Sequence, residues 1–137
     1  MSAGYSGTPL PKKLGITEAS RVLLLGAPEG FAETLGRLPV GAALRTDLRG
    51  KEEADVAILF VRSRKELEAG FPKVAERMKP AGGVWIAWPK KASKVVTDMT
   101  ENVAREVILP TSWVDVKVAA IDDVWSGLRF VKRLSVR

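Results

Sequence analysis

The sequence contains neither cysteine nor histidine. Without cysteine there is no disulfide, no thiolate nucleophile and no zinc–sulfur site. Without histidine the commonest general base and metal ligand is also missing. Much of ordinary hydrolase chemistry is therefore excluded, and we expect no bound metal.

Long apolar runs are absent as well. No run approaches the roughly 18 residues that a membrane span needs, and the first 13 residues, MSAGYSGTPLPKK, lack the charged-then-apolar order of a signal peptide. We therefore expect a cytoplasmic protein with no membrane partner. The length of 137 residues suits one domain. We expect residues 1–7, rich in Gly and Ser, to form a loose arm and residues 8–137 to form a single α/β domain.

Basic residues outnumber acidic ones, 22 Lys and Arg against 16 Asp and Glu, which gives a formal charge of +6. This excess favours contact with anions. Net charge alone, however, reports on solubility and weak nucleic-acid attraction more than on function. From this number alone, a solvated basic surface is the better interpretation.

Three apolar runs are continuous rather than alternating: Arg21–Gly26, Val56–Val61 and Gly83–Trp88. Continuous runs are typical of strands covered on both faces, which favours a parallel sheet. Trp85 and Trp88 are expected to point to opposite faces of the last run, both in the core. Ala43–Leu48 is a weaker strand candidate.

Helical signals lie between these runs. Ser63 and Glu66 form a capping box, followed at helical spacing by Leu67, Phe71, Val74 and Met78, with Pro72 expected to kink or split the helix. A second helix is predicted from a cap at Asp98, with Glu101 three residues on, a buried stripe of Met99, Val103 and Val107, and an end at Pro110.

Two shorter helices are predicted nearer the N-terminus. One has Pro28 and Glu29 in its opening turn and Phe31, Leu35 and Leu38 on one side. The other has Thr8 as its cap, Pro9 at its first position and Gly15 as its stop.

Two strand-like runs close the chain, Asp115–Ile121 and Leu128–Leu134, separated by the turn-rich link Asp122–Gly127. The alternation before them predicts a Rossmann-like open α/β sheet with helices on both faces. We expect four parallel strands and a final hairpin that adds one antiparallel strand. The link Leu48–Asp55 is too short to hold another strand and helix.

Two segments resemble class I S-adenosylmethionine-dependent methyltransferases. Leu10–Gly30, LPKKLGITEASRVLLLGAPEG, looks like the family's opening helix, Leu-Gly turn, first strand and glycine loop, and Met78–Trp88, MKPAGGVWIAW, is similar to its Lys-Pro-Gly-Gly turn and fifth strand. On this resemblance Ala54–Val61 is the fourth strand, the hairpin supplies the sixth and seventh, and the usual third strand is missing. More narrowly, LGI, GGVW with a following PK, and WSG resemble a bacterial family of short proteins known as a domain of unknown function.

The chain departs from the methyltransferase pattern at the cofactor loop. Leu24 stands where the family carries an acidic residue and Pro28 where it carries its middle glycine, while Gly26 and Gly30 match. Asp47 falls where an acidic residue accepts from ribose hydroxyls, although a surface aspartate in a turn is the commoner role. The resemblance thus implies cofactor contacts at Gly26, Glu29, Gly30 and Asp47, weakened by these changes. Where amine-methylating enzymes carry Asn-Pro-Pro-aromatic, this chain has VRSR, so no catalytic residue is predicted.

Positive charge follows the strands at their carboxyl ends, where open α/β sheets bind ligands. We predict an anion site from Arg62, Ser63, Lys90 and Lys91, with the three cations converging on one shared anion. Trp125 and Ser126, in the predicted turn, are added as ligand contacts: the indole could offer a flat face to a base, or it could pack beneath the hairpin. Solvation of an apolar loop explains the lysines equally well.

Three functions remain open at this point. The first is a non-catalytic methyltransferase-like module that binds an anionic small molecule, a nucleotide or a protein partner. The second is an active methyltransferase that retains S-adenosylmethionine by backbone contacts. The third is weak nucleic-acid binding through Lys12, Lys13, Arg62, Lys90, Lys91 and the tail Val131–Arg137.

Overall fold

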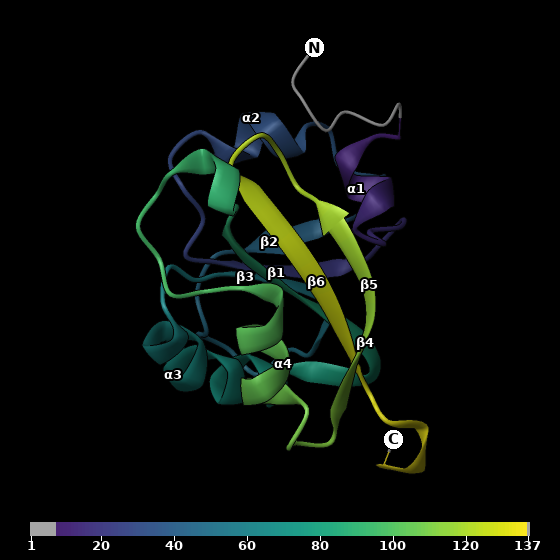
Figure 1. Ribbon diagram of the computed structural model, residues 1–137. Coiled ribbons are helices and arrows are strands. Elements are labelled where there is room, and N and C mark those ends of the chain that lie inside the picture. Colours follow the sequence, from purple (N-terminus) through teal and green to yellow (C-terminus); the bar gives the residue numbers. More distant parts are fainter. Residues whose placement is uncertain (1–7, 137) are drawn as a thin grey trace.

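Six strands form one sheet in the order β2-β1-β3-β4-β6-β5 in the computed structural model, which describes residues 8–136 (Figure 1). The strands are β1 Arg21–Leu25, β2 Ala43–Arg45, β3 Ala54–Phe60, β4 Met78–Pro89, β5 Trp113–Ala120 and β6 Trp125–Lys132. The α-helices are α1 Leu10–Lys13, α2 Phe31–Leu35, α3 Arg64–Ala75 and α4 Glu101–Ile108, with short 3₁₀ turns η1 Lys91–Ser93 and η2 Leu134–Val136. None of the helices within residues 8–136 is long and apolar enough to cross a membrane.

The strand directions confirm the predicted topology. β2 pairs with β1, β1 with β3, and β3 with β4, all in parallel. β6 runs antiparallel between β4 and β5. Residues 46–53 join β2 to β3 with no strand or helix between them, so β2 is the edge of the described sheet.

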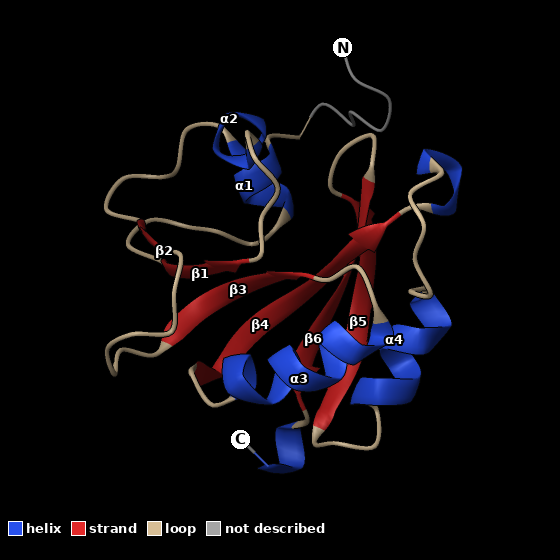
Figure 2. Ribbon diagram, turned by 90° about the vertical axis from the view of Figure 1, so that its left-hand side faces the viewer, coloured by secondary structure: helices blue, strands red, loops and turns tan. Residues whose placement is uncertain are grey.

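Helices cover both faces of the sheet, as Figure 2 shows. Leu14 and Phe31, from the segments of α1 and α2, pack with Trp85 on one face. Leu67 of α3 and Ile108 of α4 pack with Trp88 on the other. The two tryptophans therefore point to opposite faces and both lie in the core, as their separation along the strand requires.

α3 differs from its prediction in two respects. It continues through Pro72 to Ala75 without splitting, and Met78 belongs to β4, where it pairs with Ala54. One of the two bonds of the predicted capping box is confirmed, because the Ser63 hydroxyl accepts the N–H of Glu66 at 3.1 Å. The Glu66 carboxylate reaches back one residue further than expected, to the N–H of Arg62 at 2.6 Å.

The predicted start of α4 was wrong by two residues. Thr100 caps the helix by accepting the N–H of Val103 at 3.1 Å. Asp98 instead accepts the N–H of Arg64 at 2.8 Å, a bond between the starts of two helices that local sequence does not reveal. The later start also rotates the buried stripe to Ala104 and Ile108, and leaves Val103 and Val107 partly buried beside it. The helix ends before Pro110, as expected.

The short N-terminal helices are smaller than predicted. Pro9, not Thr8, occupies the cap position of α1, and no side chain caps it. Gly15 does follow the helix, with a φ of +84°. α2 begins only after Gly30, so Pro28 and Glu29 precede the helix and Leu38 follows it. The predicted arm, residues 1–7, lies outside the described residues.

The hairpin turn is tighter than predicted. One oxygen of the Asp122 side chain accepts the N–H groups of Val124 and Trp125, at 2.8 and 2.7 Å. This local closure lets β6 begin at Trp125, so Trp125 and Ser126 are strand residues and not turn residues. Pro89 also stays in the sheet, opposite Trp125, because an antiparallel partner there requires no N–H from it.

Candidate functional site

The carboxyl ends of β1, β3 and β4 meet at one edge of the sheet, and β6 begins there because it runs the opposite way. We call this the carboxyl edge. It holds the loop after β1, the start of α3, and the loop from Lys90 to Thr100 that leads to α4. All but one of the predicted site residues lie on these segments or on the first residues of β6.

Gly26 has a packing role at this edge. Its φ is +71°, and a Cβ added there would lie 2.7 Å from the carbonyl oxygen of Phe60. Glycine is therefore required where the loop after β1 passes over the end of β3. Leu24, in the place of the family's acidic residue, is buried in the core with Phe31 and Phe60. Packing between strands explains both residues without a cofactor.

The last residues of this loop are exposed. Glu29 and Gly30 face solvent, and Gly30 has a φ of +84° with no atom within 4 Å of its Cβ position. The N–H of Phe31 donates to the carbonyl of Pro28 at 3.1 Å, which closes a turn just before α2. With only five residues, α2 gives little support to a ligand at its start.

Asp47 lies two residues beyond β2 and is exposed. One oxygen of its carboxylate accepts the N–H of Arg49 at 3.0 Å, which closes a turn in the link to β3. This bond is the kind of local closure typical of a surface aspartate.

The sites implied for a methyltransferase cofactor are therefore a poor fit to an adenosyl group. Pro28 removes a backbone donor, Leu24 supplies no carboxylate at the edge, and Asp47 is part of a turn. Gly30 alone keeps an open approach.

Two loops of the carboxyl edge are locked together by hydrogen bonds. The hydroxyl of Thr97 donates to the carbonyl of Arg62 at 2.6 Å and also accepts the N–H of Met99 at 3.0 Å. Together with the bond from Arg64 to Asp98, these contacts tie the segment after β4 to the segment after β3. Ser63 is occupied by capping α3, so its hydroxyl serves the helix first.

Three aromatic rings form a row beneath the edge. Phe31 meets Phe60 edge to face at 4.8 Å between ring centroids, and Phe60 meets Trp125 in the same way at 5.0 Å. The guanidinium of Arg62 lies 5.1 Å from the centre of the Trp125 ring. Trp125 is only 6% exposed, so its packing role holds and it offers no open face to a base.

Lysines gather in the loop after β4. Lys90 is half-buried, with its N–H bonded to the carbonyl of Val124 at 2.7 Å, and Lys91 is exposed. Lys94 is exposed and has a φ of +64°, uncommon for a side chain of its size. Within residues 8–136, no carboxylate forms an ion pair with these three lysines.

Arg62 and Lys90 share the edge but start from opposite faces. Arg62 lies over Trp125, whose ring belongs to the α1–α2 face. Strand alternation puts Lys90 on the side of Trp88, which faces α3 and α4. The two side chains therefore leave the backbone on opposite sides of this edge. Ser126, paired with Trp88, is a half-buried strand residue.

The predicted basic surface for nucleic acid is divided. Val131 and Lys132 of the predicted tail end β6, and residues 133–136 follow it, so the eight residues of β6 separate the tail by about 23 Å from the carboxyl edge. Arg137 lies outside the described residues. Figure 1 shows the segment after β6 at the opposite end of this strand from the turn that begins it. Lys12 and Lys13 lie on α1.

Sequence reasoning missed the apolar part of the lysine loop. Val96 is 96% exposed and Val95 45% exposed, and Val124, bonded to Lys90 through the backbone, is 37% exposed. One signal in the sequence was available: two valines directly follow Lys94 in a segment that lacks the periodicity of a strand, so they were candidates for exposed apolar side chains. Large exposed apolar side chains in a fixed loop indicate a contact surface when they cluster.

No protein-family model matches the chain, and no curated protein matches it. Solved structures do match. A ribosomal protein L11 methylase from Lactobacillus delbrueckii subsp. bulgaricus aligns with a TM-score of 0.62 at 11% identity, covering 90% of this chain and 75% of that one. DhpI, solved as a complex with SAH, aligns with a TM-score of 0.59 at 13% identity over 92% and 83%.

TrmN from Thermus thermophilus aligns with a TM-score of 0.56 at 14% identity and covers 91% of this chain. The chain spans about half of TrmN, 47% of its length. Identities this low establish the fold alone. The strand order, the antiparallel β6 and these alignments agree: the chain has the fold of the class I S-adenosylmethionine-dependent methyltransferases, shortened between β2 and β3.

Proposed function

We propose that the protein is a non-catalytic binding module on a methyltransferase fold, and that an acidic segment of a partner protein binds at its carboxyl edge. One observation carries this proposal. Lys90, Lys91 and Lys94 lack carboxylate partners within the described chain, and they share a hydrogen-bonded loop with the exposed Val95 and Val96. Cations beside apolar side chains favour a partner that presents both carboxylates and apolar groups.

The distribution of charge favours an extended partner over a small anion. Arg62 and Lys90 start from opposite faces of the sheet, which suits an extended partner better than one small anion. A polypeptide that crosses the edge can reach both. The bonds of Thr97 and Asp98 hold the loop in place before binding, which reduces the entropy lost on association.

A protein partner explains the surface better than a nucleic acid does. Nucleic-acid binding draws on phosphate contacts and on exposed aromatic rings that stack with bases. Trp125 is buried, and the basic tail lies at the other end of β6. The exposed valines would contribute nothing to phosphate contacts, whereas they can bury area against leucine or valine of a partner.

Catalysis is disfavoured by the chemistry at the edge. The segment after β3 contributes Arg62, Ser63 and Arg64, whose backbone groups or hydroxyl are engaged in the bonds that lock the two loops and cap α3. Without histidine, the sequence has no side chain whose ordinary pKa lies near neutral pH.

Replacing Lys90 and Lys91 with alanine is expected to abolish most partner binding and leave stability unchanged. The probe is a fluorescent peptide in which glutamate and leucine alternate, followed by anisotropy. The double variant should bind about tenfold more weakly, because two ion pairs of up to about 1 kcal/mol each are lost.

Val96→Ser should weaken binding of the same peptide about threefold or more, because apolar burial against the peptide is lost. The thermal midpoint should stay within about 2 °C for all of these variants, because Lys91 and Val96 are exposed and the half-buried Lys90 makes no ion pair within residues 8–136.

The matched control is Lys12→Ala with Lys73→Ala, which removes the same net charge from two exposed lysines on other elements. It should bind the peptide nearly as the wild type does. Equal losses in both double variants would show a mere net-charge effect and contradict the proposal. A single-stranded oligonucleotide bound more tightly than the peptide, with a steep salt dependence, would favour nucleic acid instead.

The second candidate is S-adenosylmethionine binding with an active methyltransferase. The comparisons favour it to the extent that one of the matching structures, DhpI, is a complex with SAH. In this chain, binding of the cofactor would depend on the exposed Gly30 and Asp47. A direct titration with the cofactor decides between the two.

A further inference from the structure

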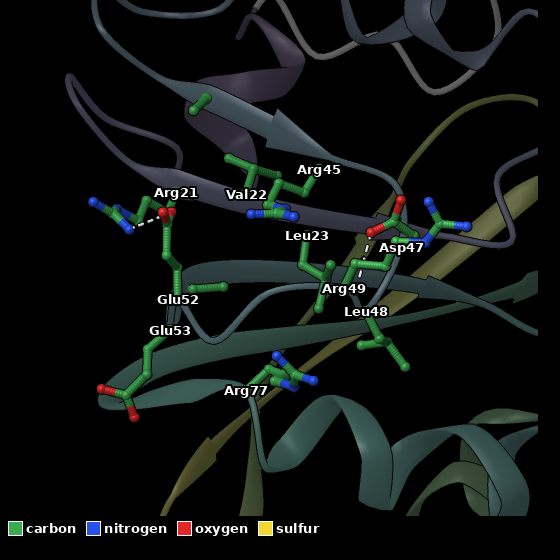
Figure 3. Close-up of a pocket in the computed structure, with 12 residues that line it drawn as sticks. Arg21, Val22, Leu23, Arg45, Asp47, Leu48, Arg49, Glu52, Glu53 and Arg77 are labelled. Atoms are coloured by element: carbon green, nitrogen blue, oxygen red, sulfur yellow. Dashed lines mark hydrogen bonds and ion pairs between the residues drawn. The ribbon is translucent and has the colours of Figure 1, made fainter.

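A small cavity lies under the link between β2 and β3, away from the carboxyl edge (Figure 3). Its volume is about 40 Å³. Apolar side chains of Leu23, Leu48 and Ala54 contribute to its wall, and all three pack on the α3–α4 face of the sheet. Arginines from four separate segments line it: Arg21, Arg45, Arg49 and Arg77.

The cavity results from the short connection. Residues 46–53 cross from β2 to β3 without a helix to cover the first residues of these strands. Leu48 fills part of the space by packing against the core. What is left is a pocket with an apolar wall and a charged mouth.

The carboxylates near this mouth are already engaged or point elsewhere. Glu52 pairs with Arg21. Asp47 closes its own turn by accepting the N–H of Arg49. Figure 3 shows the side chain of Glu53 directed away from the arginines.

Two guanidiniums lie near Gly50, on opposite sides of the pocket in Figure 3. Arg77 donates a hydrogen bond to the Gly50 carbonyl. Arg45 lies so close that a Cβ on Gly50, whose φ is +82°, would be 3.1 Å from its guanidinium nitrogens. Arg45 has no ion-pair partner within residues 8–136. Two cations beside one residue repel each other unless an anion joins them.

We infer that this cavity binds a small organic carboxylate, with the carboxylate between Arg45 and Arg77 and a short apolar chain against Leu23 and Ala54. Guanidinium groups match a planar carboxylate with two parallel hydrogen bonds. The volume of about 40 Å³ has room for about three water-sized groups, which a chain of three or four carbons would fill. Inorganic phosphate fits less well, because it has no apolar part to place on the wall.

The test is a titration of the full chain with sodium butyrate, followed by the amide NMR signals of residues 48–54 at constant ionic strength. Butyrate is expected to bind in the millimolar range and to exceed acetate by about tenfold, because each buried methylene strengthens binding about fourfold. Butyramide, of the same shape but neutral, should bind at least about tenfold more weakly than butyrate.

Arg45→Gln should weaken butyrate binding about tenfold or more. Because Arg45 is exposed, this variant is expected to fold normally. The control is Arg37→Gln, an exposed arginine by the groove between α1 and α2, which should leave binding unchanged. Ala43→Leu, which places a larger side chain on the cavity lining, should abolish binding without loss of the fold.

Three results would overturn this inference. Equal binding of butyrate and butyramide would show that the guanidiniums do not recognise the carboxylate. Inorganic phosphate bound more tightly than butyrate would show that the apolar wall is not used. An unchanged affinity in Arg45→Gln, or an equal loss in Arg37→Gln, would place the anion elsewhere.

Discussion

Replacing Gly26 with alanine is expected to lower the free energy of unfolding by about 4 kcal/mol. The added methyl would lie 2.7 Å from the Phe60 carbonyl oxygen, a backbone atom that cannot turn aside, and the φ of +71° disfavours any side chain. Strain at such a φ costs about 1–3 kcal/mol and overpacking a similar amount. For a chain of 137 residues the thermal midpoint should fall by about 15 °C, measured by circular dichroism.

Gly30→Ala provides the matched control. Its φ is +84°, close to that of Gly26, but no atom lies within 4 Å of the added methyl. Only the backbone strain applies, so the expected loss is about 1–2 kcal/mol. If both alanine variants lost the same stability, the contact with Phe60 would not explain why position 26 is glycine.

Replacing Trp85 with phenylalanine is expected to cost about 3 kcal/mol. The side chain is fully buried, and its indole nitrogen donates to the carbonyl of Leu14 at 2.9 Å, which joins β4 to the end of α1. Phenylalanine leaves a cavity and removes the donor from a buried carbonyl. Urea denaturation should show the loss as a lower midpoint with an unchanged slope.

Trp88→Phe separates the two contributions. Trp88 is also buried, on the opposite face, and no hydrogen bond of its indole is found among residues 8–136. Only the smaller ring volume counts there, so the expected loss is about 1 kcal/mol. Equal losses at both positions would mean that the bond to Leu14 contributes nothing.

Strand pattern and chain length were enough to predict the fold. The continuous apolar runs at Val56–Val61 and Gly83–Trp88 became neighbouring parallel strands because each is covered on both faces. The short link after β2 left no room for another strand and helix. Both inferences rest on local composition and on how far a chain can reach, which one sequence contains.

Element boundaries failed where a long-range bond competed with a local one. Asp98 and Thr100 are both acceptable caps, and only the bond from Arg64 decides that Asp98 serves the neighbouring helix start. The segment before Gly83 looked like a turn because of its proline and glycines. It extends β4 instead, since Met78 pairs with Ala54 across an irregular register.

For the candidate site, the sequence could predict where its residues lie in the fold, but not what they contact. Topology placed Arg62 and Lys90 at one edge, because β3 and β4 are neighbours. It could not show that the Arg62 guanidinium rests on Trp125, which required the tight turn at Asp122. The arginine cavity had no signal at all, because Arg21, Arg45 and Arg77 meet only through the tertiary fold.

We propose that this chain uses the methyltransferase fold without binding S-adenosylmethionine. Gly26 and Leu24, the positions closest to the family's cofactor loop, are explained by packing against Phe60 and Phe31. A fold can host unrelated functions when its site residues change. What this chain adds at the same edge is a fixed loop of lysines and valines.

Isothermal titration calorimetry with S-adenosylmethionine and S-adenosylhomocysteine tests this claim most directly. We expect no heat beyond dilution at cofactor concentrations up to about 1 mM, which corresponds to binding weaker than about −4 kcal/mol. The alternating glutamate–leucine peptide, titrated into the same sample, should give a measurable heat. Low-micromolar binding of either adenosyl compound, lost in Asp47→Ala, would contradict the account and assign the edge to a methyltransferase cofactor.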